Sequence, residues 1–284
     1  METTHILNAQ TMDTYRTELI EQEKSQNTVE KYMRDIRGFY FFLAGANGSA
    51  VTKQAVMKYK EHLKETYKTS SANSMLVAIN SFLKYLGWHE CCVRLLKIQK
   101  RIFREESREL TKSEYMNLVE TARKKKNERL RLVMETICAT GIRVSELKYI
   151  TIGAVKAGRA DICCKGKQRT VFIPSSLCKQ LMRYAGKNKI LSGYIFRTKT
   201  GKPLDRSNIW HDMKNLCRES GIEPSKVFPH NLRHLFARTF YNIEKDIVKL
   251  ADILGHSSVE TTRIYTISSG AEHARKVDQL GLVV

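Results

Sequence analysis

The segment HNLRHLFARTFYNIEKDIVKLADILGHSSVETTRIYT, residues 230–266, decides how the second half of the chain folds. Its apolar side chains recur at helical spacing, which predicts one helix over residues 230–241 and another over residues 246–254. The same segment carries side chains of the types that bind phosphate, transfer protons or attack as nucleophiles. These residues are His230, Arg233, His256 and Tyr265.

The sequence upstream of this segment predicts a mixed α/β domain. Residues 130–139 are an apolar helix that ends at Gly141, and another helix is expected over residues 207–220. The runs ADICC (160–164) and TVFIP (170–174) flank the polar stretch KGKQR. This pattern predicts a β-hairpin with KGKQR as its turn.

The first part of the chain is predicted to be a small all-helical bundle. Asn27, paired with Glu30 as in a capping box, opens a helix whose apolar residues run to Leu43. A second helix is expected after Thr52, and a third is stopped by Gly87.

Charge is divided unevenly along the chain. Residues 1–106 hold 16 basic and 12 acidic side chains, whereas residues 107–284 hold 33 and 17. Between them, KRIFREESREL (100–110) is dense in charge and poor in apolar residues, which indicates an exposed linker. We therefore expect a helical domain over residues 1–104 and a mixed α/β domain over residues 108–284.

Composition narrows the class of protein. The 284 residues include 49 Lys and Arg against 29 Asp and Glu, and the resulting charge of +20 indicates a polyanionic partner. Hydrophobic residues make up 42% of the chain, which favours packed cores over disorder. The seven cysteines form no C-x-x-C pair, which argues against a zinc module. No apolar run approaches the ~18 residues of a membrane span, so a soluble, cytoplasmic protein is expected.

Four segments, taken in order, resemble the tyrosine recombinase family, also called phage integrases. The segments are ATGIRVSEL (139–147), CCKGKQRTVFIP (163–174), HNLRH (230–234) and ILGHSSVETTRIYT (253–266). In that family the matching positions hold Arg, Lys, His-x-x-Arg, His and a nucleophilic Tyr. The corresponding residues are Arg143, Lys165, His230, Arg233, His256 and Tyr265. The resemblance implies an all-α core-binding domain followed by a mainly α catalytic domain with a small antiparallel sheet.

The residue types suit cleavage of a DNA phosphodiester. A five-coordinate phosphorus concentrates negative charge on its non-bridging oxygens, and the forked donors of Arg143 and Arg233 fit that charge. A tyrosine hydroxyl has a pKa of about 10, so attack by Tyr265 needs nearby positive charge and a proton acceptor. His230 is the candidate base.

Two further residues complete the expected chemistry. Lys165, on the hairpin turn, is the candidate general acid for the departing 5′ oxygen. Lys167 is the alternative, but Lys165 matches the first position of the family's K-G-x-K-x-R pattern, from which this loop departs by being one residue shorter. His256 would donate to a non-bridging oxygen or orient Tyr265. The 3′-phosphotyrosyl product resembles the starting diester in energy, so rejoining needs neither ATP nor metal, and no cofactor is expected.

Other interpretations of these residues stay open. His230, His234 and His256 would imitate a metal triad, but Arg233 would place a fixed positive charge beside the ion. His234 is otherwise a structural hydrogen-bonding residue. Glu146 is either a first-turn helix carboxylate or a support for an active-site Arg or His.

The resemblance implies a site-specific recombinase that exchanges strands of duplex DNA through a Holliday junction. Its partner would be double-stranded DNA with inverted half-sites, bound by a dimer on one site and a tetramer on paired sites. The chain length favours a simple Xer-like or transposon-encoded resolvase type, acting in cointegrate or dimer resolution or in integration and excision. Two alternatives are a type IB topoisomerase-like enzyme that relaxes DNA and a non-catalytic architectural DNA-binding protein.

The tail after Tyr265 predicts an exchanged element. Residues 268–270 are a turn-like break, after which apolar residues recur at near-helical spacing. So short a helix is marginal alone and must dock. It docks either on its own domain or in trans on a neighbouring protomer, and the break just after the nucleophile favours the trans arrangement.

Overall fold

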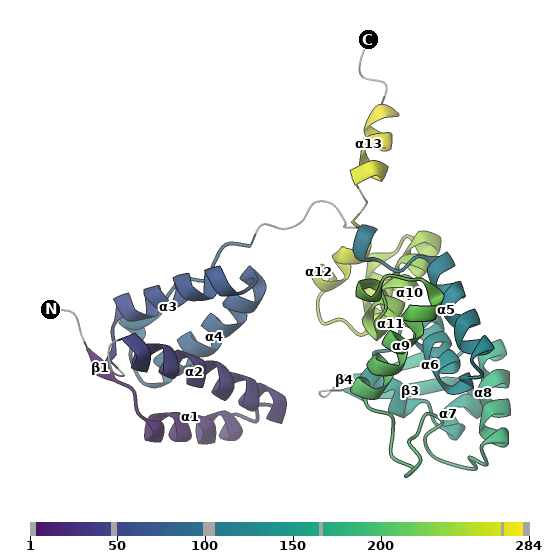
Figure 1. The fold of residues 1–284 in the computed structure, drawn as a ribbon, viewed down its shortest axis with the longest axis horizontal. Coiled ribbons are helices and arrows are strands. Elements are labelled where there is room, and N and C mark those ends of the chain that lie inside the picture. The colour runs from purple at the N-terminus through teal and green to yellow at the C-terminus, as the bar shows by residue number, and fades with distance from the viewer. Residues whose placement is uncertain (1–3, 47–49, 99–105, 165–166, 268–269, 281–284) are drawn as a thin grey trace. The chain divides into compact units, whose positions relative to one another are not determined.

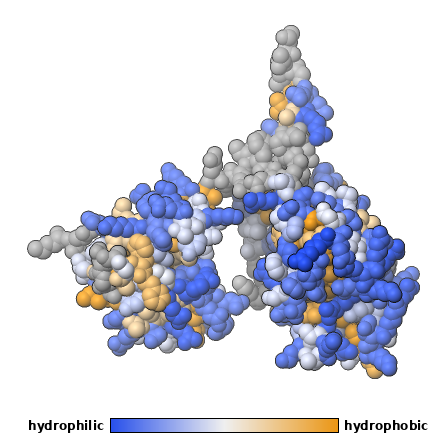
Figure 2. All heavy atoms as spheres, viewed as in Figure 1, coloured by the Kyte–Doolittle hydropathy of each residue, from blue (hydrophilic) through white to orange (hydrophobic). Residues whose placement is uncertain are grey.

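The computed structural model describes residues 4–46, 50–98, 106–164, 167–267 and 270–280. The chain forms two compact units, Met1–Lys100 and Arg101–Val284 (Figure 1). Each unit has its own hydrophobic core, and the visible face of each is mainly hydrophilic (Figure 2). Among the described residues, no helix is long and apolar enough to cross a membrane.

The described residues of the first unit form four α-helices and one short strand pair. Thr52 accepts a hydrogen bond from the amide of Ala55 and opens the predicted second helix, and Gly87 follows the end of the predicted third. Both predictions are confirmed. The elements are α1 (Ala9–Glu21), α2 (Gln26–Ala46), α3 (Lys53–Thr66), α4 (Thr69–Tyr85), β1 (His5–Ile6) and β2 (Ala50–Val51).

Two details of the first unit differ from the sequence prediction. The helix predicted to open at Asn27 begins at Gln26, because the Ser25 carbonyl already accepts the amide of Thr28 at 2.8 Å. Asn27 therefore lies inside the first turn of α2 rather than at its cap. The unit is also not entirely helical, since β1 pairs antiparallel with β2, in a contact too short to produce a sequence pattern.

The described part of the second unit is mainly helical, with one two-stranded hairpin beside the helices (Figure 1). The helices predicted over residues 130–139, 207–220, 230–241 and 246–254 are confirmed as α6, α9, α10 and α11. The helices are α5 (Lys112–Lys124), α6 (Glu128–Thr140), α7 (Ile152–Ala157), α8 (Ser175–Lys187), α9 (Arg206–Ser220), α10 (Pro229–Glu244), α11 (Ile247–Leu254), α12 (Val259–Thr262) and α13 (Gly270–Asp278). Two 3₁₀ turns also shape the site, η3 (Val144–Tyr149) and η5 (Arg263–Tyr265).

The predicted hairpin is confirmed, with longer strands than expected. Strand β3 (Arg159–Cys164) pairs antiparallel with β4 (Lys167–Phe172), and Ile162 lies opposite Arg169. The stretch KGKQR is therefore not all turn, because its last three residues extend the ladder. Along β4, Val171 is buried whereas Phe172 is 75% exposed, so alternate residues face the core.

Two glycines end the helices that lead into the candidate site. Gly141 follows α6 with φ of +66°, and Gly255 follows α11 with φ of +64°, a left-handed conformation that glycine adopts without steric cost. A Cβ atom at Gly141 would lie 2.4 Å from the ring of Phe236, and one at Gly255 would lie 2.8 Å from Arg169 Nη1. The chain therefore passes close to its neighbours immediately before Arg143 and His256.

Candidate active site

Separate elements of the second unit bring five of the six residues predicted from the sequence into one site. His230 and Arg233 lie on α10, Arg143 follows α6, His256 follows α11, and Tyr265 ends η5. A continuous series of contacts, described below, joins the five side chains. Lys165 lies outside the described residues.

Arg233 is at the centre of the site and is 1% exposed. Its Nη1 donates to the carbonyl of Gly141 at 2.6 Å, and its Nη2 donates to the carbonyl of Leu254 at 2.7 Å. Burial, together with the nearby Arg143, lowers the pKa of Arg233 to about 10, so the guanidinium is charged at neutral pH. Its Nε has no hydrogen-bond partner among the described residues, although buried donors are normally paired. That donor is available to a bound anion.

Arg143 is held beside this group by a buried carboxylate. Its Nη1 donates to Glu146 Oε1 at 3.1 Å, its backbone amide donates to Glu146 Oε2 at 2.7 Å, and its Nη2 donates to the carbonyl of Gly255 at 3.3 Å. The Arg143 side chain keeps 36% of its surface exposed, whereas Glu146 keeps 2%. Arg143 is therefore fixed in orientation and still reachable from solvent.

Glu146 has a second arginine partner, Arg169 of β4. Arg169 Nη1 and Nη2 donate to the two carboxylate oxygens at 3.1 and 2.7 Å. Burial raises the pKa of Glu146, but the hydrogen bonds from Arg169 and Arg143 outweigh that effect and hold the pKa below its ordinary value. The cluster contains three arginines, Arg143, Arg169 and Arg233, and one carboxylate, Glu146. Its charge is therefore 3 − 1 = +2, which suits a phosphodiester.

The protonation state of His256 follows from its partners. Its Nε2 lies 3.0 Å from Arg233 Nη2, and because a guanidinium only donates, Nε2 must accept. Its Nδ1 therefore carries the proton and donates to Thr262 Oγ1 at 2.8 Å. Desolvation and the neighbouring Arg233 and Arg143 lower the pKa of His256 to about 4. His256 is therefore neutral at physiological pH.

Tyr265 lies beside the arginines and is 5% exposed. Its ring forms a small apolar cluster with Ala237, Leu250 and Leu254, which fixes it against α10 and α11. It lies nearly parallel to the ring of His256, at 6.2 Å between centroids. Burial raises the pKa of Tyr265, and the charge of Arg233 opposes that rise. Attack by the hydroxyl therefore requires that its proton be taken up.

The two histidines of α10 lead from the surface to Tyr265. His230 is exposed, and its ring meets that of His234 edge-on at 4.5 Å; His234 in turn meets the Tyr265 ring edge-on at 5.1 Å. Desolvation and the adjacent Arg233 lower the pKa of His230. Desolvation and His230 lower that of His234 to about 4. His234 Nε2 is buried and has no hydrogen-bond partner within the described part of the chain.

Sequence reasoning assigned no role to Arg169 or Thr262. Arg169 was interpreted as part of a solvated turn, although it occupies the Arg position of the K-G-x-K-x-R pattern. Thr262 is fully buried, and the only signal for it was its place three residues before Tyr265. Of the described residues, the group whose donor atoms lie close enough to hold a metal is His5, Glu90 and Cys91 in the first unit. There, His5 and Glu90 already form an ion pair at 2.6 Å.

Comparisons with known proteins agree with this arrangement. Residues 108–272 match the phage integrase family, and residues 12–90 match the phage integrase N-terminal SAM-like domain. The tyrosine recombinase XerA of Pyrococcus furiosus is 29% identical over 98% of this chain and 96% of its own length. The tyrosine recombinase XerC of Roseiflexus castenholzii is 31% identical over 87% of this chain and 84% of its own length.

The fold is also found in solved structures. The crystal structure of a lambda integrase dimer bound to a COC′ core site has a TM-score of 0.73 to this chain at 20% identity. The match covers 95% of this chain and 97% of that one. At this identity the likeness concerns the fold alone, and it extends through both units.

The chain belongs to the phage integrase family. It is a tyrosine recombinase, a DNA-breaking and DNA-rejoining enzyme of site-specific recombination. The matches to named recombinases favour this activity over the two alternatives, DNA relaxation of the topoisomerase type and non-catalytic DNA binding.

Proposed function

We propose that Tyr265 attacks a DNA phosphodiester, forms a 3′-phosphotyrosyl bond and releases a 5′ hydroxyl. A 5′ hydroxyl of a second strand then attacks this bond, which frees Tyr265 and joins the exchanged strands through a Holliday junction. The observation that carries the proposal is the environment of Arg233. It is a buried cation beside the nucleophile, held by two carbonyl groups, with one donor, Nε, that no described residue accepts.

Arg143 and Arg233 bind the non-bridging oxygens of the scissile phosphate. Both guanidinium groups are fixed by protein carbonyls before any substrate arrives, so little reorganisation is needed as charge develops in the transition state. Arg143, which is partly exposed, reaches the phosphate from the solvent side, whereas the buried Arg233 offers its Nε from the protein interior. Loss of either should slow cleavage by about 10²-fold or more, the usual scale for one transition-state donor.

The histidines and the hairpin lysine handle protons and orientation. Burial and Arg233 lower the pKa of His230, so its imidazole is neutral near pH 7 and accepts the Tyr265 proton once substrate binding brings the two groups within hydrogen-bond reach. His256 orients Arg233 and Tyr265, because its Nε2 is engaged by Arg233. Lys165 is the general acid that protonates the departing 5′ oxygen.

The substrate in this proposal is duplex DNA with inverted half-sites. The helical domain over residues 1–104 and the catalytic domain over residues 108–284 each contact the duplex, and most of the +20 charge lies in the second. A dimer occupies one site, and a tetramer joins two sites. Lambda integrase has been crystallised as a dimer on a core site and as a tetramer on a Holliday junction, which supports this assembly.

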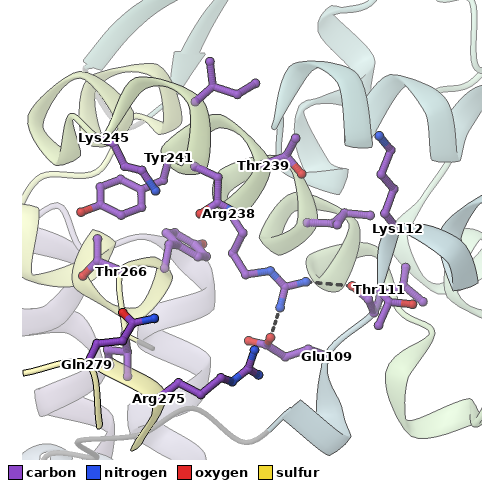
Figure 3. Close-up of a pocket in the computed structure, with 16 residues that line it drawn as sticks. Glu109, Thr111, Lys112, Arg238, Thr239, Tyr241, Lys245, Thr266, Arg275 and Gln279 are labelled. Carbon is purple, nitrogen blue, oxygen red and sulfur yellow. Dashed lines mark hydrogen bonds and ion pairs between the residues drawn. The ribbon is translucent and has the colours of Figure 1, made fainter. Parts of the chain in front are cut away.

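The tail is proposed to couple neighbouring protomers. A cavity of about 930 Å³ opens beside the C-terminal half of α10 and is bordered by Thr266 and by Arg275 and Gln279 of the tail (Figure 3). Arg238 crosses its wall to pair with Glu109 (Figure 3). The cavity thus adjoins the nucleophile segment, so a neighbour's tail docked there would influence the position of Tyr265.

The biological task in this proposal is cointegrate or dimer resolution, or integration and excision, by a simple Xer-like or transposon-encoded enzyme. Such an enzyme acts in the cytoplasm, at the nucleoid if the source is bacterial. The matches to the XerA and XerC relatives extend over most of this chain and most of theirs, which supports the simple two-domain type.

Covalent trapping tests the proposed nucleophile. A nicked suicide substrate, from which the short cleaved strand diffuses away, should trap wild-type protein as a covalent adduct. Tyr265→Phe should bind the same DNA and give no adduct. Tyr241→Phe is a matched control, because Tyr241 borders the same cavity, and it should give the wild-type yield. An adduct formed by Tyr265→Phe would show that another residue attacks.

A further inference from the structure

We propose that Arg169 is a positioning residue that fixes the hairpin carrying Lys165 against the phosphate-binding arginines. The inference rests on the proposed function, in which Lys165 is the general acid. Arg169 touches three separate parts of the site at once. It contacts the carboxylate of Glu146, the carbonyl of Ile253 and the Cα region of Gly255.

Arg169 lies on the side of its strand that faces the core. Val171 and Ile173 are each 4% exposed, and Arg169 shares their parity along β4, so it belongs to the row that faces the core. Its side chain keeps only 14% of its surface exposed. A charged side chain in this row is costly unless it is paired, so its partners indicate why it is there.

Those partners engage all three nitrogens of the guanidinium. Nη1 and Nη2 form two parallel bonds to Glu146 at 3.1 and 2.7 Å, and Nε donates to the carbonyl of Ile253 at 3.1 Å. Because Glu146 also accepts from the backbone and side chain of Arg143, a single carboxylate links β4 to the phosphate-binding Arg143. The forked geometry fixes direction as well as distance, which a lysine cannot do.

Gly255 provides independent geometric evidence. A Cβ atom there would lie 2.8 Å from Arg169 Nη1 and 2.9 Å from its Cδ, so the arginine lies directly against the backbone. The carbonyl of the same glycine accepts from Arg143 Nη2, and His256 is the next residue. The segment that positions His256 is therefore held between Arg143 and Arg169.

The consequence for catalysis follows from sequence distance. Strand β4 begins at Lys167, and Arg169 lies four residues after Lys165 along the hairpin. Arg169 is the described attachment nearest to Lys165 that ties this hairpin to Glu146 and to the loop of His256. Tyr149 also holds β3 through the carbonyl of Cys163, but without Arg169 strand β4 loses its bonds to Glu146 and to the carbonyl of Ile253. A misplacement of about 1 Å at the hairpin end can cost about 10²-fold in rate.

Leaving-group chemistry separates this role from general stability. Wild-type and Arg169→Met proteins are compared on two suicide substrates, one with the normal 5′ oxygen and one with a 5′ sulfur at the scissile bond. A sulfur leaving group departs without protonation, so it does not depend on Lys165. We expect Arg169→Met to cleave the oxygen substrate about 10²-fold more slowly and to recover most of that loss on the sulfur substrate.

Three comparison variants make the result decisive. Lys165→Ala should show the same rescue, and Arg169→Lys should resemble Arg169→Met because it lacks the fork. Arg159→Met is the matched control, since Arg159 is an exposed arginine on the same hairpin, and it should cleave both substrates normally. Thermal melting of each variant checks that it is folded at the assay temperature.

The outcomes separate the two hypotheses. Equal defects of Arg169→Met on both substrates, with rescue of Lys165→Ala, would overturn the positioning role and leave the proposed function intact. Wild-type cleavage by Arg169→Met would also overturn it. Failure of the sulfur substrate to rescue Lys165→Ala would instead refute the general acid, and a wild-type protein that formed no adduct would refute the proposed function itself.

Discussion

Replacing Gly141 by alanine should damage both stability and catalysis, and the structure gives the size of each contribution. Gly141 has φ of +66°, where an L-residue costs about 1–2 kcal/mol. The new Cβ would also lie 2.4 Å from Phe236 Cδ1, and overpacking of this kind costs about 1–3 kcal/mol. The two contributions together destabilise the second unit by about 2–5 kcal/mol.

Gly158 offers a matched control for the backbone cost. It has φ of +67°, and a Cβ there would meet no atom within 4 Å. Gly158→Ala should therefore lose only about 1–2 kcal/mol. The difference between the two alanine variants isolates the contact with Phe236. In a Phe236→Ala background the contact is gone, so Gly141→Ala should cost no more than Gly158→Ala does.

The functional effect follows from two neighbours of Gly141. Its carbonyl accepts Arg233 Nη1 at 2.6 Å, and Phe236 lies on α10 three residues after Arg233. A displaced Phe236 therefore shifts the helix that carries the central arginine. We expect slower cleavage in Gly141→Ala even at temperatures where it is fully folded, and normal cleavage in Gly158→Ala.

Equilibrium urea unfolding measures the free energy of each variant, and suicide-substrate cleavage measures the rate. Because the chain has two units, hydrogen exchange of peptides from α6 and α10 shows which unit has lost stability. Equal free-energy losses in the two glycine variants would refute the reasoning about Phe236. Normal cleavage by folded Gly141→Ala would refute the link from Phe236 to Arg233.

Three other perturbations test separate parts of the proposal. The folded-state pKa values of His234 and His256 are about 4, below their unfolded value of about 6.5, so the unfolded chain binds more protons between these limits. The stability contributed by these two neutral histidines should thus be complete above about pH 6.5 and fall as the pH drops toward 4. Melting temperatures measured over this range should depend less on pH in His256→Gln than in the wild type. An unchanged slope would contradict the lowered pKa of His256. DNA affinity measured against salt should fall by about 0.9 log units per neutralised phosphate for each log unit of salt, and a flat response would exclude a DNA clamp. Deletion of residues 270–284 should leave half-site binding in gel-shift assays but weaken assembly on paired sites, and wild-type recombination by the truncated protein would rule out a role for the tail.

The sequence by itself determined the order of the chemical groups and most of the helices that carry them. The helices around Arg143, Arg233 and His256 follow from apolar periodicity, and a glycine marks the end of the first and the last of them; these are local signals. The two helix-ending glycines, Gly141 and Gly255, also lie where the sequence pattern stops. Local signals of this kind are readable because residues three or four apart in a helix share one face of it.

The tertiary structure alone decided how those groups are held. Arg169 looked like part of a turn, because only the register of β4 against β3 shows that it faces the core. The neutral state of His256 depends on Arg233 and Thr262, which approach it from different elements. Contacts between residues far apart in the chain leave no periodic trace in the sequence. The sequence therefore determined which groups are present, and packing determined which are charged, buried and fixed in direction.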